Sequence, residues 1–494
     1  MIDTTQSWLA TSLWLLPLAS ALVVGVVPWP RRVAGTLALA AAFAEAALVA
    51  VALVRFDETG GIQFEQRHAW VRDLGLTYHV GMDGLSLVLV ALLAFVLPWA
   101  LVYALWEGRD RLRGYLGLML LLEAAVALLF VARDLALFYV GFETMLIPLA
   151  VLMAIWGGAN RVRATLRFVI YTLVGSLLML VCIITLGVRA GTFDLAGVGS
   201  SGSTWLFLGF MVAFAIKAPL YPLHGWVPDA YRESPPEVAA LLSGVISKAG
   251  AYGMLRFALP LFPGPAADWR VPLIALSLVG LLWGSLVAFR QPDSRGVIAY
   301  SSIAQMSLIV LGIFVLNDAG GTGATFQMVN HGLLSALLFL IAGLVERRFG
   351  TGLFARIGAL AHGRPALATL CITTGVAALA VPGSSLFASE FLVLLGAFRR
   401  YWLVGALASI AIVLAAMYML RWISALLHDP VEDRTLRDAV SDPARYPDVR
   451  WEAVYIVPFV AAVLALSVQP YLVTHRVTNA VHALTAPAAR EVSP

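Results

Sequence analysis

The chain has 494 residues, of which 61% are hydrophobic and 13% are charged, and its mean hydropathy is +0.87. This composition excludes a soluble globular enzyme and is typical of a protein that crosses a membrane many times. The small net charge of +4 indicates no contiguous basic surface for nucleic acid, and two cysteines are too few for an iron–sulfur cluster or a four-cysteine zinc site.

Hydropathy predicts about fourteen membrane spans, each about 20 residues long. Asp3 precedes the first span, and Arg31 and Arg32 follow it, which favours a retained first helix over a cleaved secretory signal. The expected spans begin near Trp8, Val33, Val80, Gly114, Leu135, Phe168, Trp205, Val238, Val271, Val297, Thr325, Ala366, Trp402 and Ala453.

Arginines are concentrated in the loops that follow odd-numbered spans. Because positive residues favour the cytoplasmic side, we expect these loops to be cytoplasmic and both termini to face the outside. The polar stretch from Asp429 to Arg450 is expected to be a cytoplasmic connector rather than a domain.

The only two lysines of the sequence, Lys217 and Lys248, lie within apolar segments. A charge at the centre of a bilayer costs about 3 kcal/mol on insertion scales, so an intramembrane lysine indicates a functional group. A buried lysine can release its proton, whereas arginine stays charged. The two lysines are therefore predicted to transfer protons. The alternative is that a sequence with few lysines placed two of them here by chance.

Two proline-containing segments are predicted to interrupt membrane helices. Pro219, Pro222 and Pro228 follow Lys217, and each removes a backbone donor. Pro382 lies in a second such segment, Val-Pro-Gly-Ser-Ser. Broken helices at matching positions of two inverted five-span repeats point to an ion site between the repeats. An ordinary proline kink is the alternative at Pro382.

Acidic and basic residues alternate along the spans, and this pattern predicts a proton path, which needs neighbouring groups that change each other's proton affinity. Glu45 and Asp83 are expected nearer the membrane surface, and Asp134 is expected to pair with Arg133 at a helix start. His331 alone would favour a buried structural histidine, but its neighbours favour a relay. The groups expected at membrane depth are Glu123, Glu143, Lys217, Lys248, His331 and Glu390.

A mechanism follows from this arrangement. If Glu143 approaches Lys217, the acid keeps the amine protonated. When the acid moves away, the lysine releases its proton toward Lys248, and then toward His331 and Glu390. Bridging waters are expected at serines near the breaks, Ser384 and Ser385.

Long motifs are spread over nearly all of the chain between residues 80 and 427. They occupy residues 132–148, 215–230, 248–257, 331–336 and 390–398. Together these motifs resemble the antiporter-like subunit M of respiratory complex I, the bacterial NADH:quinone oxidoreductase. Motifs of this length are specific.

The resemblance implies an all-α polytopic membrane fold of fourteen helices, with two inverted five-helix repeats and two broken helices. The implied division is 1–112 for the first three helices, 113–265 for the first repeat, 266–428 for the second repeat, and 429–494 for the connector and the last helix. The broken helices are expected near 217–222 and near 381–384.

The resemblance also implies roles for individual residues. Glu143 and Lys217 resemble a coupled acid–lysine pair, Lys248 a central relay, His331 a further relay, and Glu390 the acid near the exit. Supporting roles are implied for Glu123, His224, Gln305, Pro219 and Pro382.

The implied function is proton translocation in the membrane arm, driven by quinone reduction elsewhere in the complex. No cofactor or metal is expected on this chain, whereas flavin, iron–sulfur clusters and quinone are expected in partner subunits. The expected partners are neighbouring antiporter-like subunits and the lipid of a bacterial inner membrane.

Three residues depart from the pattern of the family. Gln305 stands where a histidine is usual, Tyr231 replaces another usual histidine, and Ser389 replaces a glycine. Gln305 cannot carry a proton as a charge, so the relay is expected to be shorter there or bridged by water.

Two alternatives stay open at this point. The same module occurs in multisubunit cation/proton antiporters and in membrane-bound hydrogenase-type complexes, where it moves sodium or protons. A scaffold subunit, whose buried charges pair only for assembly, is a candidate of a different class. No long lateral helix is expected after the last span, which favours subunit M over the larger subunit L.

Overall fold

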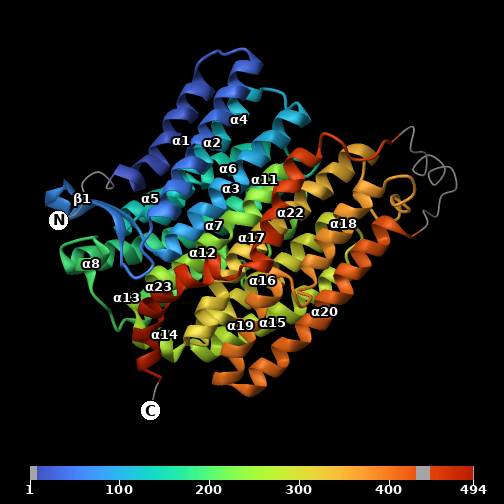
Figure 1. The fold of residues 1–494 in the computed structure, drawn as a ribbon. Coiled ribbons are helices and arrows are strands. Elements are labelled where there is room, and N and C mark those ends of the chain that lie inside the picture. Colours follow the sequence, from blue (N-terminus) through green and yellow to red (C-terminus); the bar gives the residue numbers. More distant parts are fainter. Residues whose placement is uncertain (1–7, 430–445, 493–494) are drawn as a thin grey trace.

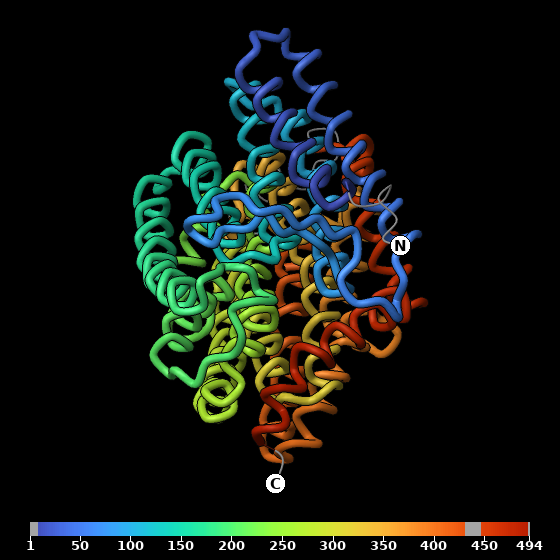
Figure 2. The backbone as a smooth tube through the Cα atoms, turned by 90° about the vertical axis from the view of Figure 1, so that its left-hand side faces the viewer, coloured from blue at the N-terminus to red at the C-terminus, as the bar shows by residue number. Residues whose placement is uncertain are grey.

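The computed structural model describes residues 8–429 and 446–492, and within them almost every segment is helical (Figure 1). Most of the connector expected between Asp429 and Arg450 lies outside the described residues. Figure 2 shows the same bundle turned by 90°, with the first helices at one end and the last segment at the other.

Eleven helices in the described residues are long and apolar enough to cross a membrane, or twelve if one bent pair counts as a span. Nine of the eleven are single helices: α1 (Trp8–Val26), α2 (Arg31–Arg55), α3 (Gly84–Glu107), α4 (Leu112–Val131), α7 (Arg161–Ala190), α15 (Arg270–Phe289), α16 (Ser294–Phe314), α17 (Asp318–Phe349) and α20 (Trp402–Leu427).

The other two spans are composite. One joins α5 (Leu135–Thr144) to α6 (Leu146–Trp156). The other runs over Pro236–Leu261 and consists of α11 (Pro236–Leu241), the π-helical turn η2 (Leu242–Ile246), α12 (Lys248–Gly253), a second π-helical turn η3 (Met254–Ala258) and α13 (Leu259–Leu261).

Two helical segments are interrupted where the prolines predicted a break. Residues 218–226 separate α9 (Thr204–Lys217) from α10 (Val227–Glu233). Residues 379–384 separate α18 (Pro365–Ala378) from α19 (Ser385–Arg400). The positions of both breaks are therefore confirmed. The count of fourteen spans and the inverted repeats stay predictions.

A short β-hairpin precedes α3 and was not expected. Strands β1 (Gln63–Val71) and β2 (Leu76–Met82) pair antiparallel around the short 3-10 turn η1 (Arg72–Leu74). The span expected from Val80 begins at Gly84 instead, because the carboxylate of Asp83 caps the helix by accepting a hydrogen bond from the Ser86 amide.

The last segment also differs from the expectation. Helix α22 (Ala453–Val468) is followed by α23 (Tyr471–Arg490), which is bent away from it by 70°. One side of α23 is buried at helical spacing, through Val473, Val477 and Val481. The last segment is therefore a bent pair of helices and not the single last helix that hydropathy predicted.

The ends of the bundle define two faces. The hairpin, the loop 191–203 with α8 (Leu195–Val198), α14 (Pro263–Asp268) and α23 form the hairpin face. The opposite face, which we call the arginine face, carries loops 27–30, 108–111, 157–160 and 290–293. Helix α17 is buried over residues 320–345 and the span Pro236–Leu261 over nearly all its length, whereas the apolar parts of α1, α2 and α20 are mostly not buried. The centre of the bundle is therefore built around the span of Lys248.

Candidate functional site

Lys217 is the last residue of α9, directly before the first break. Its side chain is 1% exposed, and its Nζ lies 5.3 Å from the ring centre of Phe142 and 5.6 Å from that of Phe168. Glu143 is half-buried and interacts electrostatically with the amine, but the two do not form one of the ion pairs of the described residues. Aromatic faces thus stabilise the ammonium where the acid is not in contact.

The break after Lys217 is held by specific hydrogen bonds. The indole of Trp226 donates to the carbonyl of Ile216 at 2.9 Å, and the Leu220 amide donates to the carbonyl of Ala215. His224 lies in the break, with its ring 4.7 Å from that of Trp283. These contacts satisfy carbonyls that the prolines leave without helical donors.

Lys248 lies between the two π-helical turns and is fully buried. Its Nζ donates hydrogen bonds to the carbonyl of Ser243 and, at 3.3 Å, to the hydroxyl of Ser247. The ion pairs of the described residues do not include Lys248. π-Helical turns occur frequently at functional sites, and here they free backbone oxygen for the amine.

Serine hydroxyls connect the surroundings of Lys248 to His331. Ser243 Oγ lies 3.0 Å from Ser302 Oγ, and Ser302 Oγ lies 3.0 Å from His331 Nε2. The hydroxyl of Ser335 also contacts Ser243. The hydrogen-bonded hydroxyls thus run from Ser243 to His331, and the backbone carbonyl of the same serine accepts from Lys248.

Sequence reasoning missed most of this serine chain. Ser243 and Ser335 are buried hydroxyls in apolar spans, and this is the only signal that points to them. Tyr231, which departs from the family pattern, lies beside Ser243 and Ser302 and makes no direct hydrogen bond within the described residues.

A second polar chain begins at Glu390, on α19. Its Oε1 accepts a hydrogen bond from Gln305 Nε2 at 3.0 Å, and Gln305 Oε1 accepts one from Gln327 Nε2 at 2.6 Å. The chain continues through Ser389, whose hydroxyl donates to Gln327 and accepts from Asn330 Nδ2 at 2.9 Å. Gln305, Gln327 and Ser389 thus fix the side chain of Glu390.

A small cavity lies between the two polar chains. It measures about 20 Å³ and is lined by His331, Gln305, Ser301 and Tyr418, among others. A neighbouring cavity of about 10 Å³ touches both Gln305 and Glu390. Because one water needs about 10–15 Å³, the first cavity has room for about one water between the histidine and the glutamine.

Glu123 lies away from these chains and faces Glu45. Both carboxyls are fully buried, they interact with each other, and they make no direct hydrogen bond to any other described side chain. The expectation that Glu45 lies near the membrane surface is wrong, because it faces the interior in the middle of α2. Two carboxyls so close to each other cannot both ionise at low cost.

Asp83 and Asp134 have structural partners. Asp83 pairs with Arg256 at 2.5 Å and with Arg133 at 3.2 Å. Burial favours protonation of the Asp83 carboxyl, but the two guanidinium groups outweigh it and hold its pKa well below the ordinary value. Asp134 caps α5 by accepting from the Ala136 amide, so the expected pairing of Asp134 with Arg133 is wrong. Three segments are tied together at the hairpin face by Asp83.

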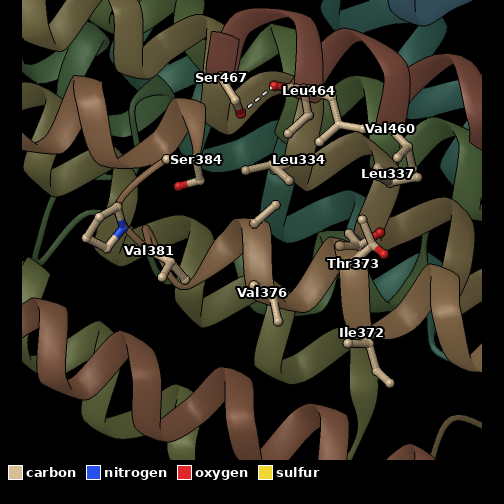
Figure 3. A pocket seen from close by; sticks show the side chains of 15 residues that line it. Leu334, Leu337, Ile372, Thr373, Val376, Val381, Ser384, Val460, Leu464 and Ser467 are labelled. Carbon is tan, nitrogen blue, oxygen red and sulfur yellow. Dashed lines mark hydrogen bonds between the residues drawn. The ribbon is translucent and has the colours of Figure 1, made fainter.

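The second break is lined by an apolar cavity of about 450 Å³, shown in Figure 3. Leu334 and Leu337 of α17, Val376 of α18 and Leu464 of α22 face it. The hydroxyl of Ser467 accepts a hydrogen bond from the Ser385 amide at 2.8 Å, which fixes the start of α19.

The residues expected at the second break divide by role. Ser384 caps α19 by accepting from the Phe387 amide, and Pro382 lies on the cavity wall. The hydroxyl of Ser385 has no direct hydrogen-bond partner within the described residues, so a bridging water there stays a prediction. No group of three or more His, Cys, Asp or Glu residues in the described ranges is arranged to hold a metal ion.

Comparisons with known proteins give a consistent result. The model of the family described as NADH:quinone oxidoreductase/Mrp antiporter, TM, matches residues 132–415. An NADH-quinone oxidoreductase subunit M of Mycobacterium tuberculosis (strain ATCC 25618 / H37Rv) is 38% identical, over 94% of this chain and 91% of that protein. The subunit of the same name from Rhodobacter capsulatus is 36% identical, over 93% of both chains.

Solved structures share the fold. A chain of respiratory complex I from Thermus thermophilus with bound NADH aligns with a TM-score of 0.87 and 30% identity, over 98% of this chain and 100% of that one. A chain of the Mrp complex from Dietzia sp. DQ12-45-1b aligns with the same TM-score of 0.87 at 22% identity, over 99% of both chains. The latter likeness concerns the fold alone.

Proposed function

Since the chain belongs to the family of NADH:quinone oxidoreductase and Mrp antiporter membrane subunits, we propose that it carries protons along Glu143, Lys217, Lys248, His331 and Glu390. It is a proton-translocating membrane-arm subunit of an NADH:quinone oxidoreductase, with other membrane-arm subunits as partners. The identities of the groups that move the proton are the proposal.

One observation carries this proposal. The fully buried Lys248 donates to the backbone carbonyl of Ser243, and the hydroxyl of the same serine begins a hydrogen-bonded series that runs through Ser302 to His331. The lysine lies in a span that has a π-helical turn on either side of it. A scaffold subunit needs no such chain, because charges that only assemble helices are paired with opposite charges. Lys248 has no carboxylate partner within ion-pair distance in the described residues, which favours transport.

Lys217 is placed so that it can take up and release a proton. Glu143 is half-buried and close enough to attract the Lys217 ammonium without contacting it. A small approach of the acid keeps the proton on Lys217, and a small retreat releases it toward Lys248. The aromatic rings of Phe142 and Phe168 lower the cost of the charge during the retreat.

The passage from His331 to Glu390 requires a bridge, since Gln305 does not titrate. The cavity between His331 and Gln305 has the volume of about one water. A water there would pass the proton from the histidine toward Glu390. Tyr418 also lines this cavity.

We also propose the energy source of the subunit and its orientation in the membrane. The proton gradient is driven by quinone reduction in partner subunits, which would hold the flavin, the iron–sulfur clusters and the quinone. The membrane is a bacterial inner membrane, the arginine face is cytoplasmic, and both termini lie outside. Support for this orientation comes from the arginines in the loops of that face.

The test uses the whole complex in inverted membrane vesicles that carry Lys217→Ala. NADH-driven quinone reduction and acidification of the lumen are measured together. We expect the complex to assemble and both activities to fall. The reason is that the variant has no side chain at position 217 that can take up and release the proton. Lys217→Arg should fail in the same way, since arginine keeps the charge but does not release its proton.

Arg189→Ala is the matched control, because Arg189 is exposed at the end of α7 and belongs to none of the ion pairs of the described residues. Wild-type rates of both activities in Lys217→Ala would contradict the proposal and make the lysine structural. Loss of assembly in Lys217→Ala, with normal coupling in Lys217→Arg, would instead support the scaffold function.

A further inference from the structure

A groove opens between α1, α4 and α6 where these helices reach the arginine face. Its volume is about 670 Å³, within the range of about 300–1,000 Å³ that ligand pockets occupy. Its walls are mainly apolar, with Leu22 of α1, Leu118 and Leu121 of α4, and Val151 and Ile155 of α6. The groove runs inward along these helices from the arginine face.

Three arginines line the outer end of this groove: Arg31, Arg111 and Arg113. Within the described residues none of them forms an ion pair. Arg31 donates to the carbonyls of Gly108 and Arg109, and Arg113 donates to the carbonyl of Val27 at 3.4 Å. Arg31 and Arg113 thus donate to backbone carbonyls and to no acid among the described residues.

Four other arginines of the same face are paired with acids. Arg109 binds Glu237 at 2.8 Å, Arg232 binds Asp293, Arg295 binds Glu346 and Arg347 binds Glu107. Asp110 is the acid of the groove's own loop, and it is exposed and joins none of these pairs. Arg32, Arg163 and Arg290 of this face are exposed and also join none of the ion pairs of the described residues, so the groove is set apart by having three such arginines on one mainly apolar cavity.

Two tryptophans indicate that the outer end of the groove lies at the level of the lipid headgroups. Trp29 and Trp156 both line it, and the indole of Trp156 donates to the carbonyl of Asp110 at 2.9 Å. Tryptophan is enriched at the level of lipid headgroups, where one end of the ring is apolar and the other is wet. Arg111 adopts a φ of 47° at the start of α4, a conformation that costs energy for a residue other than glycine.

We propose that this groove binds a phospholipid with an anionic headgroup. The phosphate lies against Arg31, Arg111 and Arg113, because guanidinium groups match phosphate oxygens in geometry and charge. One acyl chain lies along Leu118 and Leu121. Basic pockets between helices at a membrane surface bind such headgroups, and the charge of the site distinguishes anionic from zwitterionic lipid. This binding does not depend on the proton path.

The experiment compares purified whole complexes by native mass spectrometry. In the rim variant, Arg31, Arg111 and Arg113 are each replaced by Gln. In the groove variant, Leu118→Trp fills the acyl site and leaves the arginines in place. The matched control replaces Arg72, Arg189 and Arg399 by Gln, which removes three exposed arginines that belong to none of the described ion pairs.

We expect the rim and groove variants each to lose one tightly bound anionic phospholipid per complex, while the control keeps it. Delipidated wild-type complex mixed with phosphatidylglycerol vesicles should regain that lipid, and complex mixed with phosphatidylcholine vesicles should not. Equal lipid content in all variants would overturn the proposal. So would unchanged lipid with loss of a neighbouring subunit in the rim variant, since the groove would then be a protein interface.

Discussion

The surroundings of the two lysines differ in how firmly they are fixed. Lys217 has two aromatic rings and a half-buried acid that it does not contact. Lys248 has direct hydrogen bonds, one of them to the backbone carbonyl of Ser243, whose hydroxyl connects through Ser302 to His331. Lysine therefore serves two purposes in this protein. The first lysine is placed where a small movement changes its charge partner, and the second is held by hydrogen bonds beside a fixed series of serine hydroxyls.

Asp83 anchors the span of Lys248 at the hairpin face through its ion pairs. Removal of its charge should have the largest effect on stability. Asp83→Asn leaves Arg133 and Arg256 buried without their acid, so we expect a loss of about 3–5 kcal/mol in unfolding free energy. The measurement is thermal unfolding of the purified complex, followed through this subunit. A loss below about 1 kcal/mol would show that the span of Lys248 does not depend on this anchor.

The same anchor predicts a pH dependence. The pKa of Asp83 is lower in the folded chain than in the unfolded chain, so its stabilisation is present above the unfolded value of about 3.9. That stabilisation is lost as the pH falls through the folded pKa. The stability gap between wild type and Asp83→Asn should therefore be constant from about pH 8 to pH 5 and close only under strong acid. A gap that closes near pH 6 would contradict the ion pairs.

Gln305 tests the second polar chain, which holds the side chain of Glu390. Gln305→Leu removes the hydrogen bond to Glu390 and leaves the buried carboxyl without its donor, which costs about 1–3 kcal/mol. Proton translocation should fall on the order of tenfold with the complex assembled. Gln305→Glu, which keeps the size but adds an acid, is the comparison variant. Wild-type translocation in Gln305→Leu would exclude this link from the path.

Ser302 tests the series of hydroxyls between Ser243 and His331, with a smaller effect. Ser302→Ala removes one hydroxyl, whose hydrogen bonds are worth about 0.5–1.5 kcal/mol each, and a water can take its place. We expect a fall of several-fold in translocation and recovery in Ser302→Thr, which restores the hydroxyl. Equal rates in the alanine and threonine variants would show that the hydroxyl carries no proton.

The sequence was sufficient to predict the class of the fold, the two breaks and the burial of both lysines. These features depend on local signals: apolar runs, prolines and charges in apolar segments. The hairpin and α23 were not predicted, because they lie along one face of the bundle. The first strand of the hairpin is mostly exposed, and α23 is buried on one side only, so neither gives a membrane-span signal by itself.

Partners of the buried charges were harder to predict than their positions. Arg133 is adjacent to Asp134 in sequence, yet it pairs with Asp83 because the hairpin carries Asp83 to the start of α5. Glu45 appeared to be near a span end but faces Glu123 across two helices. Serines such as Ser243 are too common in membrane helices to be singled out without the structure. Contacts between distant segments decide these roles.

The most direct test of the proton path is one measurement on Lys248→Met in inverted membrane vesicles. Methionine fills the space of the lysine stem without a titratable group, so the spans around it keep their packing. With the complex assembled, NADH-driven acidification of the lumen should fall on the order of 10²-fold, the usual worth of a positioned acid–base group. Acidification at the wild-type rate would contradict the path through Lys248.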